Sequence, residues 1–549
     1  MEEGGLSGLI WPVQSRPISA LGEVNREGYP VNIAKQSSWP RGAARLCAGA
    51  SALAILAATP VMAQEVDPAT EGSTETDPIV VTGIRGSLTT AINTKRNAEV
   101  MVDSISAQDI GALPDRSVSE ALQRIPGVTL QRTNENRDPA RLAAEGGGIF
   151  IRGLSWVRSE FNGRDSFSAN NGRSLSFEDV SADLMAGIDV YKNPSADLIE
   201  GGVGGLVNLR TRKPFDAPGQ VFALSGDYNY ADLRDKGFWS ANALYSNRWS
   251  LGGGEVGLLL SGSIGNIGNR TDSIQLGRYQ PIVPTAADAT ANMTAGNTYF
   301  VPSSLGWRRI DWQQRRTSFD GVLQLRPSDK MTFTLEAFYS KASPRDIERA
   351  HGVYSLPTID SSYQFDDRNV LVAGTYANAN MDLDTRYGQA DKTTQDYSIK
   401  WEYQPAENLR ISADVQRVYS EARMLSMTAF TEFGVTNDPT SPLRPDLVFN
   451  LRGNSPSVIA EENGASLAQQ SNYWWAAAMD HIEHNEAGSW AERADIEYTF
   501  GEDSFFRSLR LGARVTDKSA ITRQTGWNWG LLSNQYWGAG WMNPVYLNG

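Results

Sequence analysis

The sequence has 549 residues, a formal net charge of -13 at pH 7 and a pI near 5.0. Because phosphate-binding surfaces are basic, this acidic balance argues against a nucleic-acid-binding protein. No stretch supplies the roughly 20 consecutive apolar residues that a transmembrane helix needs, so a membrane location would require a β-barrel.

Residues 1–40 show no hydrophobic periodicity, and we expect an upstream extension without structure. Residues 41–63 predict a secretory signal peptide, with two arginines at the start and an uncharged run from Leu46 to Ala58. Val61-Met62-Ala63 then supplies the small residues of a cleavage site. A buried helix is the alternative, but the acidic segment that follows disfavours it.

Residues 64–77 are acidic and poor in apolar side chains, which predicts a disordered linker. Residues 78–83 follow, with four strand-forming residues between Pro78 and Gly83 and no neighbouring strand. A lone strand on a flexible tether suits β-augmentation, in which the sheet edge of a partner supplies the missing backbone hydrogen bonds. The plainer alternative is the first strand of the next domain.

Residues 96–214 form a compact block with a mixed α/β pattern. Ser106 with Asp109, and Ser117 with Glu120, have the spacing that begins short helices. The candidate strands are Val128 to Gln131, Ile149 to Arg152, Gly187 to Lys192 and Gly205 to Arg210. We therefore expect a small sheet covered by short helices.

From residue 218 onward, apolar and polar residues alternate in segments of about ten residues, a length typical of outer-membrane barrel strands. Tight turns and long polar loops join the segments alternately, and aromatic residues lie near the strand ends, which also favours a transmembrane β-barrel. A soluble β-sandwich or propeller stays open on the alternation alone. The expected hairpins pair 319–325 with 331–339, 397–403 with 409–415, and 494–500 with 509–515, and the expected long loops are 266–312, 342–393 and 422–489.

Six motifs of the compact block together resemble the plug of TonB-dependent outer-membrane receptors, most closely the branch common in Caulobacter and Xanthomonas relatives. The motifs are Asp103 to Gly111, Pro114-Asp115, Glu120 to Val128, Ile151 to Leu154, Val190 to Asp197 and Glu200 to Arg212. The resemblance implies a mixed α/β plug domain, residues 96–214, followed by a transmembrane antiparallel β-barrel of about 22 strands. We expect residues 218–549 to hold only the N-terminal part of that barrel, so that the chain is truncated.

The resemblance also implies that residues 79–83 are similar to a TonB box, the segment gripped by TonB with its inner-membrane energising complex. These residues are Ile79, Val80, Val81, Thr82 and Gly83. The implied function is energised, plug-gated uptake of a large solute across a Gram-negative outer membrane, with the plug and the TonB box accessible from the periplasm. The expected partners are TonB, outer-membrane lipid and a small-molecule or oligosaccharide ligand, and no nucleic acid.

An oligosaccharide is the expected ligand, because the loops are rich in aromatic residues and the resembled branch includes many carbohydrate transporters. A siderophore or iron complex, or a truncated remnant that does not transport, is the alternative. The candidate ligand contacts are Trp156, Arg158, Asn162, Arg164, Asp165, Trp474 and Trp475. The plug residues among them could instead satisfy the barrel wall, and the aromatic residues could pack the loops.

We expect neither a metal site nor a cofactor, and no enzyme activity. His481 and His484 have a spacing that can bind a metal on a helix, but no third ligand is evident. Catalysis would need a nucleophile beside a base, and the three histidines, which include His351, lie in loop-like stretches without such a motif.

Overall fold

The computed structural model describes residues 91–106, 117–134, 138–169, 174–353, 356–357, 359–434 and 443–532. All of them belong to one of the two compact units of the chain, residues 79–549. The predicted signal peptide, linker and TonB box, residues 41–83, lie outside the described residues and stay predictions. Among the described helices, none has the length and apolar character needed to cross a membrane.

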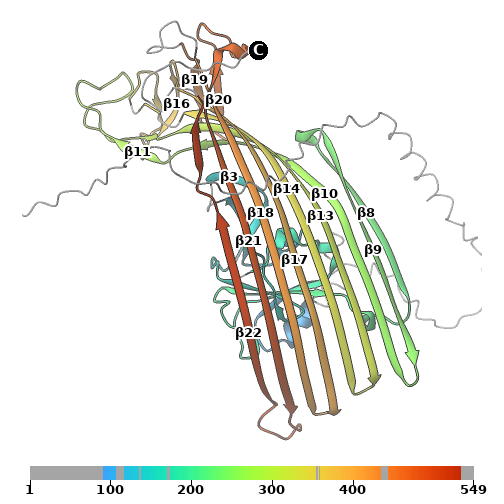
Figure 1. Ribbon diagram of the computed structural model, residues 1–549. Coiled ribbons are helices and arrows are strands. Elements are labelled where there is room, and N and C mark those ends of the chain that lie inside the picture. The colour runs from blue at the N-terminus through green and yellow to red at the C-terminus, as the bar shows by residue number, and fades with distance from the viewer. Residues whose placement is uncertain are drawn as a thin grey trace, which may run out of the picture. The chain divides into compact units, whose positions relative to one another are not determined.

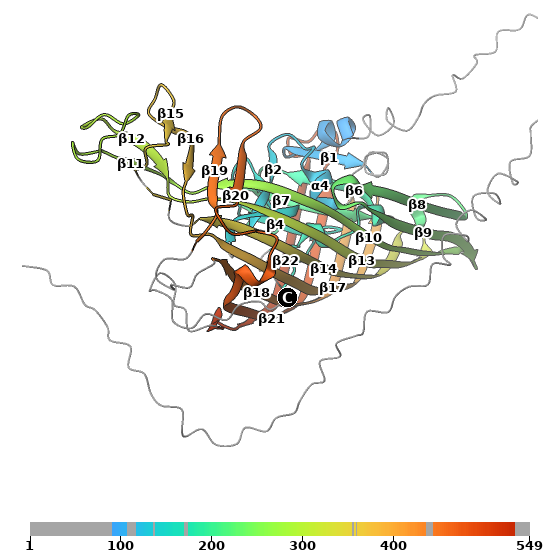
Figure 2. The same cartoon turned by 90° about the horizontal axis from the view of Figure 1, so that it is seen from above.

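The plug contains a five-stranded sheet with the order β1-β6-β7-β4-β5, in which only β4 and β7 pair in parallel (Figure 2). Its strands are β1 (Val102–Ser106), β4 (Val157–Phe161), β5 (Arg164–Asp165), β6 (Met185–Tyr191) and β7 (Gly205–Thr211). Helix α4 (Val118–Leu122) and the hairpin of β2 (Val128–Asn134) and β3 (Asp138–Ile151) complete the core. Short 3-10 turns follow at η2 (Phe177–Asp179), η3 (Ala182–Leu184) and η4 (Pro214–Asp216). The plug is thus the small mixed α/β domain that the sequence predicts.

The four strands predicted in the plug are confirmed as β2, β3, β6 and β7, and a helix follows Ser117 as expected. The Ser117 side chain does not cap that helix, because its hydroxyl bonds to the hydroxyl of Ser119 at 2.8 Å. Ser106 itself ends β1 and pairs with Gly187 of β6. The helix predicted to follow it would occupy residues outside the described ranges and stays a prediction.

A sheet of ten antiparallel strands, here called the wall, follows the plug (Figure 1). Each long strand pairs with the long strand next in sequence, and among the described residues β8 and β22 do not pair with each other, so the sheet is open. The plug and the wall together form the plug-and-barrel fold that the sequence predicts. The strands are β8 (Val221–Ala231), β9 (Lys236–Leu251), β10 (Gly254–Leu276), β13 (Leu305–Ser328), β14 (Met331–Val353), β17 (Asp382–Ala406), β18 (Leu409–Phe433), β21 (Tyr473–Thr499), β22 (Ser508–Gln524) and β23 (Asn528–Leu531); η5 (Asp232–Arg234) joins β8 to β9.

The central wall strands are longer than predicted, with 23 residues in β10 and 27 in β21. The tight turns predicted near residues 328 and 407 are confirmed, since β13 and β14, and β17 and β18, meet there. The predicted long loops were too wide, because their outer portions are strand; the long connections are residues 277–304, 354–381 and 434–472.

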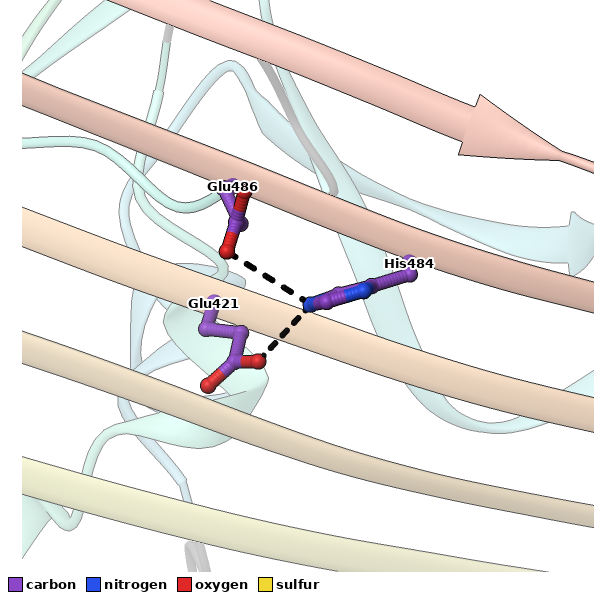
Figure 3. Close-up of side chains that lie close together, drawn as sticks. All are labelled: Glu421, His484 and Glu486. Carbon is purple, nitrogen blue, oxygen red and sulfur yellow. Dashed lines mark hydrogen bonds and ion pairs between the residues drawn. The ribbon is translucent and has the colours of Figure 1, made fainter. Parts of the chain in front are cut away.

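The polarity of the outward-facing residues explains why the lengths of the wall strands were underestimated. On β14 these positions are apolar near the tight turn, with Phe333 and Leu335, but polar beyond it, with Lys341 and Arg345. On β18 and β21 the side chains of Glu421, His484 and Glu486 likewise gather on the outward face (Figure 3). Once both faces are polar, the two-residue hydrophobic period that marks a strand disappears from the sequence.

The long connections fold against one another and have a hydrophobic core of their own. Strand β16 of one connection pairs with β19 of the next, and the core centres on Tyr363, Leu371, Leu447 and Phe449 (Figure 2). The strands here are β11 (Tyr279–Ile282), β12 (Tyr299–Pro302), β15 (Gln364–Phe365), β16 (Leu371–Tyr376), β19 (Asp446–Asn450) and β20 (Ser457–Glu461), with η6 (Gln470–Asn472) before β21. These connections therefore form a preorganised rim at the long-loop end of the wall.

Candidate functional site

A buried ion pair joins the plug to the wall. Arg164 of β5, whose side chain is 6% exposed, places Nη2 2.5 Å from Oε2 of Glu336 on β14. The other oxygen of Glu336 accepts hydrogen bonds from the Thr211 hydroxyl at 2.6 Å and from the Asn162 amide. Three plug side chains thus converge on one wall carboxylate, and each satisfies a polar group that burial would otherwise leave unpaired.

The turn between β4 and β5 explains how Arg164 reaches the wall. Asn162 and Gly163 both have positive φ, 49° and 78°, and they connect the paired residues Phe161 and Arg164. Asn-Gly is the preferred sequence for a two-residue hairpin turn of this kind, because both residues tolerate the left-handed conformation. The side-chain amide oxygen of Asn162, Oδ1, also accepts a hydrogen bond from the backbone N–H of Thr211 at 3.0 Å, which fixes the hairpin against β7.

A second polar cluster lies behind this hairpin. Asp165 forms a 2.7 Å ion pair with Arg158 and lies 3.8 Å from Nζ of Lys518 on β22. Glu160 is also buried, and its carboxyl has no comparably close ion pair among the described residues. Burial, and then the negative charge of Asp165, raise the pKa of Glu160 to about 7.

This raised pKa predicts a pH-dependent plug. In the unfolded chain Glu160 ionises near pH 4.5, whereas in the folded plug it holds its proton up to about pH 7. The folded form therefore binds more protons in that window, so the free energy of unfolding falls as pH rises through it, by up to about 3 kcal/mol. Thermal unfolding of the purified protein at pH 5 and pH 8 measures the change. Glu160→Gln is expected to remove the fall in stability between pH 5 and pH 8, whereas Glu200→Gln, at an exposed residue, is expected to keep it. Equal pH dependence of stability in both variants would contradict the assignment of this effect to Glu160.

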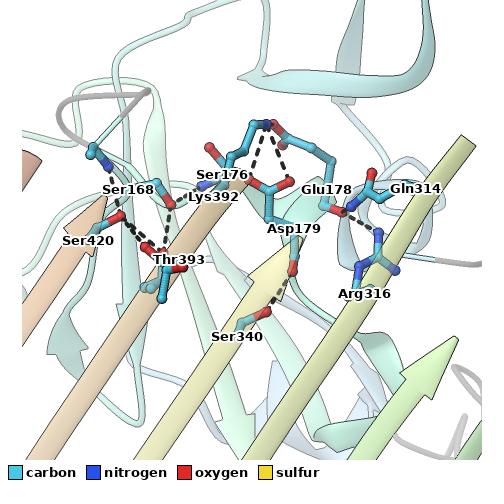
Figure 4. A network of polar contacts seen from close by, with 12 residues as sticks. Ser168, Ser176, Glu178, Asp179, Gln314, Arg316, Ser340, Lys392, Thr393 and Ser420 are labelled. Atoms are coloured by element: carbon cyan, nitrogen blue, oxygen red, sulfur yellow. Dashed lines mark hydrogen bonds and ion pairs between the residues drawn. The ribbon is translucent and has the colours of Figure 1, made fainter. Parts of the chain in front are cut away.

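The turn η2 forms a third contact with the wall (Figure 4). Nζ of Lys392 on β17 lies 3.2 Å from the Asp179 carboxylate, and the Ser340 hydroxyl of β14 donates to the Asp179 carbonyl at 2.7 Å. The Glu178 carbonyl accepts from Gln314 and Arg316 on β13. Three consecutive wall strands therefore hold one short turn of the plug, largely through backbone carbonyl oxygens.

The structure places most of the predicted plug contacts in these interfaces. Arg158, Asn162, Arg164 and Asp165 contact the wall or one another, as the alternative interpretation of the sequence proposes. Trp156 is 65% exposed; on β21, Trp474 is buried and Trp475 is partly exposed. A ligand contact by any of these seven residues stays a prediction.

Inward-facing positions between the plug contacts and the rim form a polar surface that the sequence analysis missed. Arg308 pairs with Glu348, Arg386 donates to the Ser426 hydroxyl at 2.8 Å, and Arg444 interacts electrostatically with Glu432. Carboxylates outnumber the arginines on this surface, so it is acidic. The carboxylates are Asp346, Glu348, Asp382, Asp384, Glu432 and Glu483; the arginines are Arg308, Arg386 and Arg444.

Aromatic rings line the same surface. Trp527 stacks on His481 with ring centroids 4.4 Å apart, and Trp529 of β23 stacks on Phe430 at 4.8 Å. The Glu483 carboxylate lies 3.0 Å from Nε2 of His481. Trp529 is 57% exposed, so one face of this aromatic and acidic surface, here called the inner wall, is open to a solute.

The three histidines lie on strands, which corrects their prediction as loop residues. His351 is on β14, and His481 and His484 are on β21. Successive strand side chains point to opposite faces, so His481 faces inward and His484 outward. The helical spacing considered for a shared metal site therefore does not apply.

In the described residues, an α/β plug is bonded to the inner face of a sheet of long antiparallel strands. The family model described as TonB-dependent Receptor Plug Domain matches residues 94–206. Residues 94–206, which include most of the plug, therefore resemble a TonB-dependent receptor plug domain.

Several solved structures are similar to this chain at low sequence identity. The ferric enterobactin receptor PfeA from Pseudomonas aeruginosa is 13% identical over 79% of this chain and 72% of its own, with a TM-score of 0.35. The ferric citrate transporter FecA is 14% identical over 79% of this chain and 80% of its own, with a TM-score of 0.27. The RagAB peptide importer is 13% identical over 76% of this chain and 56% of its own, with a TM-score of 0.32. No curated protein sequence matches the chain significantly.

Proposed function

We propose that this protein is an outer-membrane receptor that takes up a large solute by TonB-driven, plug-gated transport. The main observation in support is that the plug is bonded to the wall through a few discrete buried contacts, chiefly the Arg164–Glu336 pair and the turn η2. Contacts of this kind hold a plug closed at rest and can break in sequence under a pulling force. The proposed location is the Gram-negative outer membrane, with lipid around the wall and the TonB box in the periplasm.

The order of the plug sheet supports a path for the force. β1 is an edge strand, paired only with β6, and it is the first described strand after the predicted TonB box at residues 79–83. Between them, Glu99 pairs with Arg510 of β22 at 2.8 Å, and the Met101 N–H donates to Asn193 at 2.7 Å. A pull by TonB would load these exposed contacts first and then peel β1 from β6, before it reached the buried Arg164–Glu336 pair.

The side chains of the inner wall favour a neutral ligand that is rich in hydroxyl groups, and we propose that the ligand is an oligosaccharide. Aromatic faces such as that of Trp529 stack on sugar rings, and carboxylates such as that of the partly exposed Asp384 accept hydrogen bonds from hydroxyl groups. The acidic excess of the inner wall would repel an anionic ferric chelate. A siderophore or iron complex is therefore the second candidate, and such a complex would have to carry no net negative charge.

Ligand binding to purified receptor, with labelled oligosaccharides and ferric siderophores as the panel, tests the ligand class. We expect a neutral oligosaccharide to bind, and Trp529→Ala and Asp384→Asn each to weaken binding about 10- to 100-fold, as the loss of one stacking or hydrogen-bonding group predicts. Trp239→Ala is the matched control, because Trp239 is an exposed tryptophan of β9 outside the inner wall. Preferential binding of an anionic ferric siderophore, or binding unaffected by both inner-wall variants, would contradict the proposal.

A further inference from the structure

The outward face of β18 and β21 carries a cluster of metal-ligating side chains, here called the outer triad: Glu421, His484 and Glu486. Glu421 and Glu486 lie directly across from each other in the strand register, and His484 is the next outward residue of β21. One ligand atom of each residue lies within 4.8 Å of the other two. The triad is on the face opposite the inner wall, so no residue of the proposed ligand surface belongs to it.

The distances within the triad suit a metal ion. Nε2 of His484 lies 2.8 Å from Oε1 of Glu421 and 3.7 Å from Oε1 of Glu486, so both carboxylates approach one imidazole nitrogen (Figure 3). Ligands about 2.1 Å from a divalent cation are about 3.0–3.4 Å from one another in octahedral or tetrahedral sites. The two measured separations bracket that range, so small side-chain rotations would bring all three atoms onto one ion.

Two arginines contact the carboxylates of the triad. Arg523 donates to Oε2 of Glu486 at 2.7 Å and leaves Oε1 directed toward His484, so this arginine orients the carboxylate for a metal ion without contacting the ion itself. Arg423 donates to Oε1 of Glu421 at 2.6 Å, the same oxygen that faces His484. A metal would replace Arg423 at this oxygen, and because the Arg423 side chain is 66% exposed, its release into solvent costs little.

We propose that the outer triad binds a divalent transition-metal ion, with Zn²⁺ as the reference ion. One imidazole nitrogen and two carboxylate oxygens are a donor set that such ions accept, and partial exposure of all three side chains leaves a coordination position for water. The ion would link β18 to β21 on the outside of the wall. This inference does not depend on the ligand of the inner wall.

Calorimetric titration of the purified, tag-free receptor with Zn²⁺ tests the proposal, with Co²⁺ absorption as a second readout of nitrogen and oxygen ligation. We expect one saturable site, at least 10-fold weaker binding in His484→Ala and in Glu486→Gln, and loss of the Co²⁺ bands in both. His351→Gln, which alters another wall histidine, is expected to bind Zn²⁺ like the parent protein. Absence of a saturable site, or unchanged Zn²⁺ affinity in His484→Ala, would overturn the proposal.

Arg423→Ala tests separately whether the metal replaces Arg423 at Oε1 of Glu421. Removal of the competing guanidinium is expected to raise the Zn²⁺ affinity several-fold, because the metal no longer has to displace a cation from Glu421. Affinity equal to or lower than that of the parent protein would show that the metal does not take the place of Arg423.

Discussion

Replacing Glu336 with alanine is expected to give the largest loss of stability at the plug–wall interface. The substitution leaves Arg164 buried without the carboxylate that neutralises it, and removes the acceptor of the Asn162 and Thr211 hydrogen bonds. Breaking a buried ion pair by removing one partner costs about 3–5 kcal/mol. Thermal unfolding of the purified receptor should show the loss, and cells that carry the variant should become more permeable to a large hydrophilic antibiotic.

Two comparisons make this prediction specific. Asp272→Ala removes the partner of Arg270 in a partly exposed pair on the wall and is expected to cost about 1 kcal/mol or less. Replacing both members of the buried pair, as Arg164→Met with Glu336→Leu, is expected to recover part of the stability, because neither member of the pair is then left charged without the other. If Glu336→Ala melted at the same temperature as Asp272→Ala, the pair would not hold the plug.

The parts of the fold predicted from sequence are those with a clear local period. The hairpin of residues 397–403 and 409–415 keeps one apolar face and a polar turn, and it is confirmed as parts of β17 and β18. The segment from residue 422 onward was predicted as loop although β18 runs to Phe433, because polar side chains such as Arg423 occupy the outward face there. Alternation between two polar faces leaves no hydrophobic signal to detect.

Only part of the candidate site was predicted, because its residues are far apart in the sequence and meet only in the folded protein. Arg164 and Asn162 were predicted as ligand contacts, which stays a prediction; their structural partner Glu336 lies 172 residues beyond Arg164, and only the fold brings it close. The inner wall was missed because its carboxylates sit one at a time on separate strands. His484 was compared with His481 at helical spacing, whereas on a strand it faces Glu421 of the neighbouring strand. An assignment of these residues to strands would have identified both surfaces.

The second large effect concerns the predicted TonB box. Val80→Pro removes a backbone donor and is incompatible with strand addition to a partner sheet, so coupling to TonB should be lost. Uptake of the ligand is expected to fall to the level of cells that lack TonB, while binding at the cell surface is unchanged, because the inner wall is not altered. Val80→Thr keeps both the backbone N–H and a β-branched side chain, and we expect it to transport normally.

Energised transport is the central claim, and uptake of labelled ligand measured beside surface binding in Val80→Pro cells tests it most directly. Loss of uptake with retained binding is the predicted result. Uptake equal to that of the parent receptor would contradict the account.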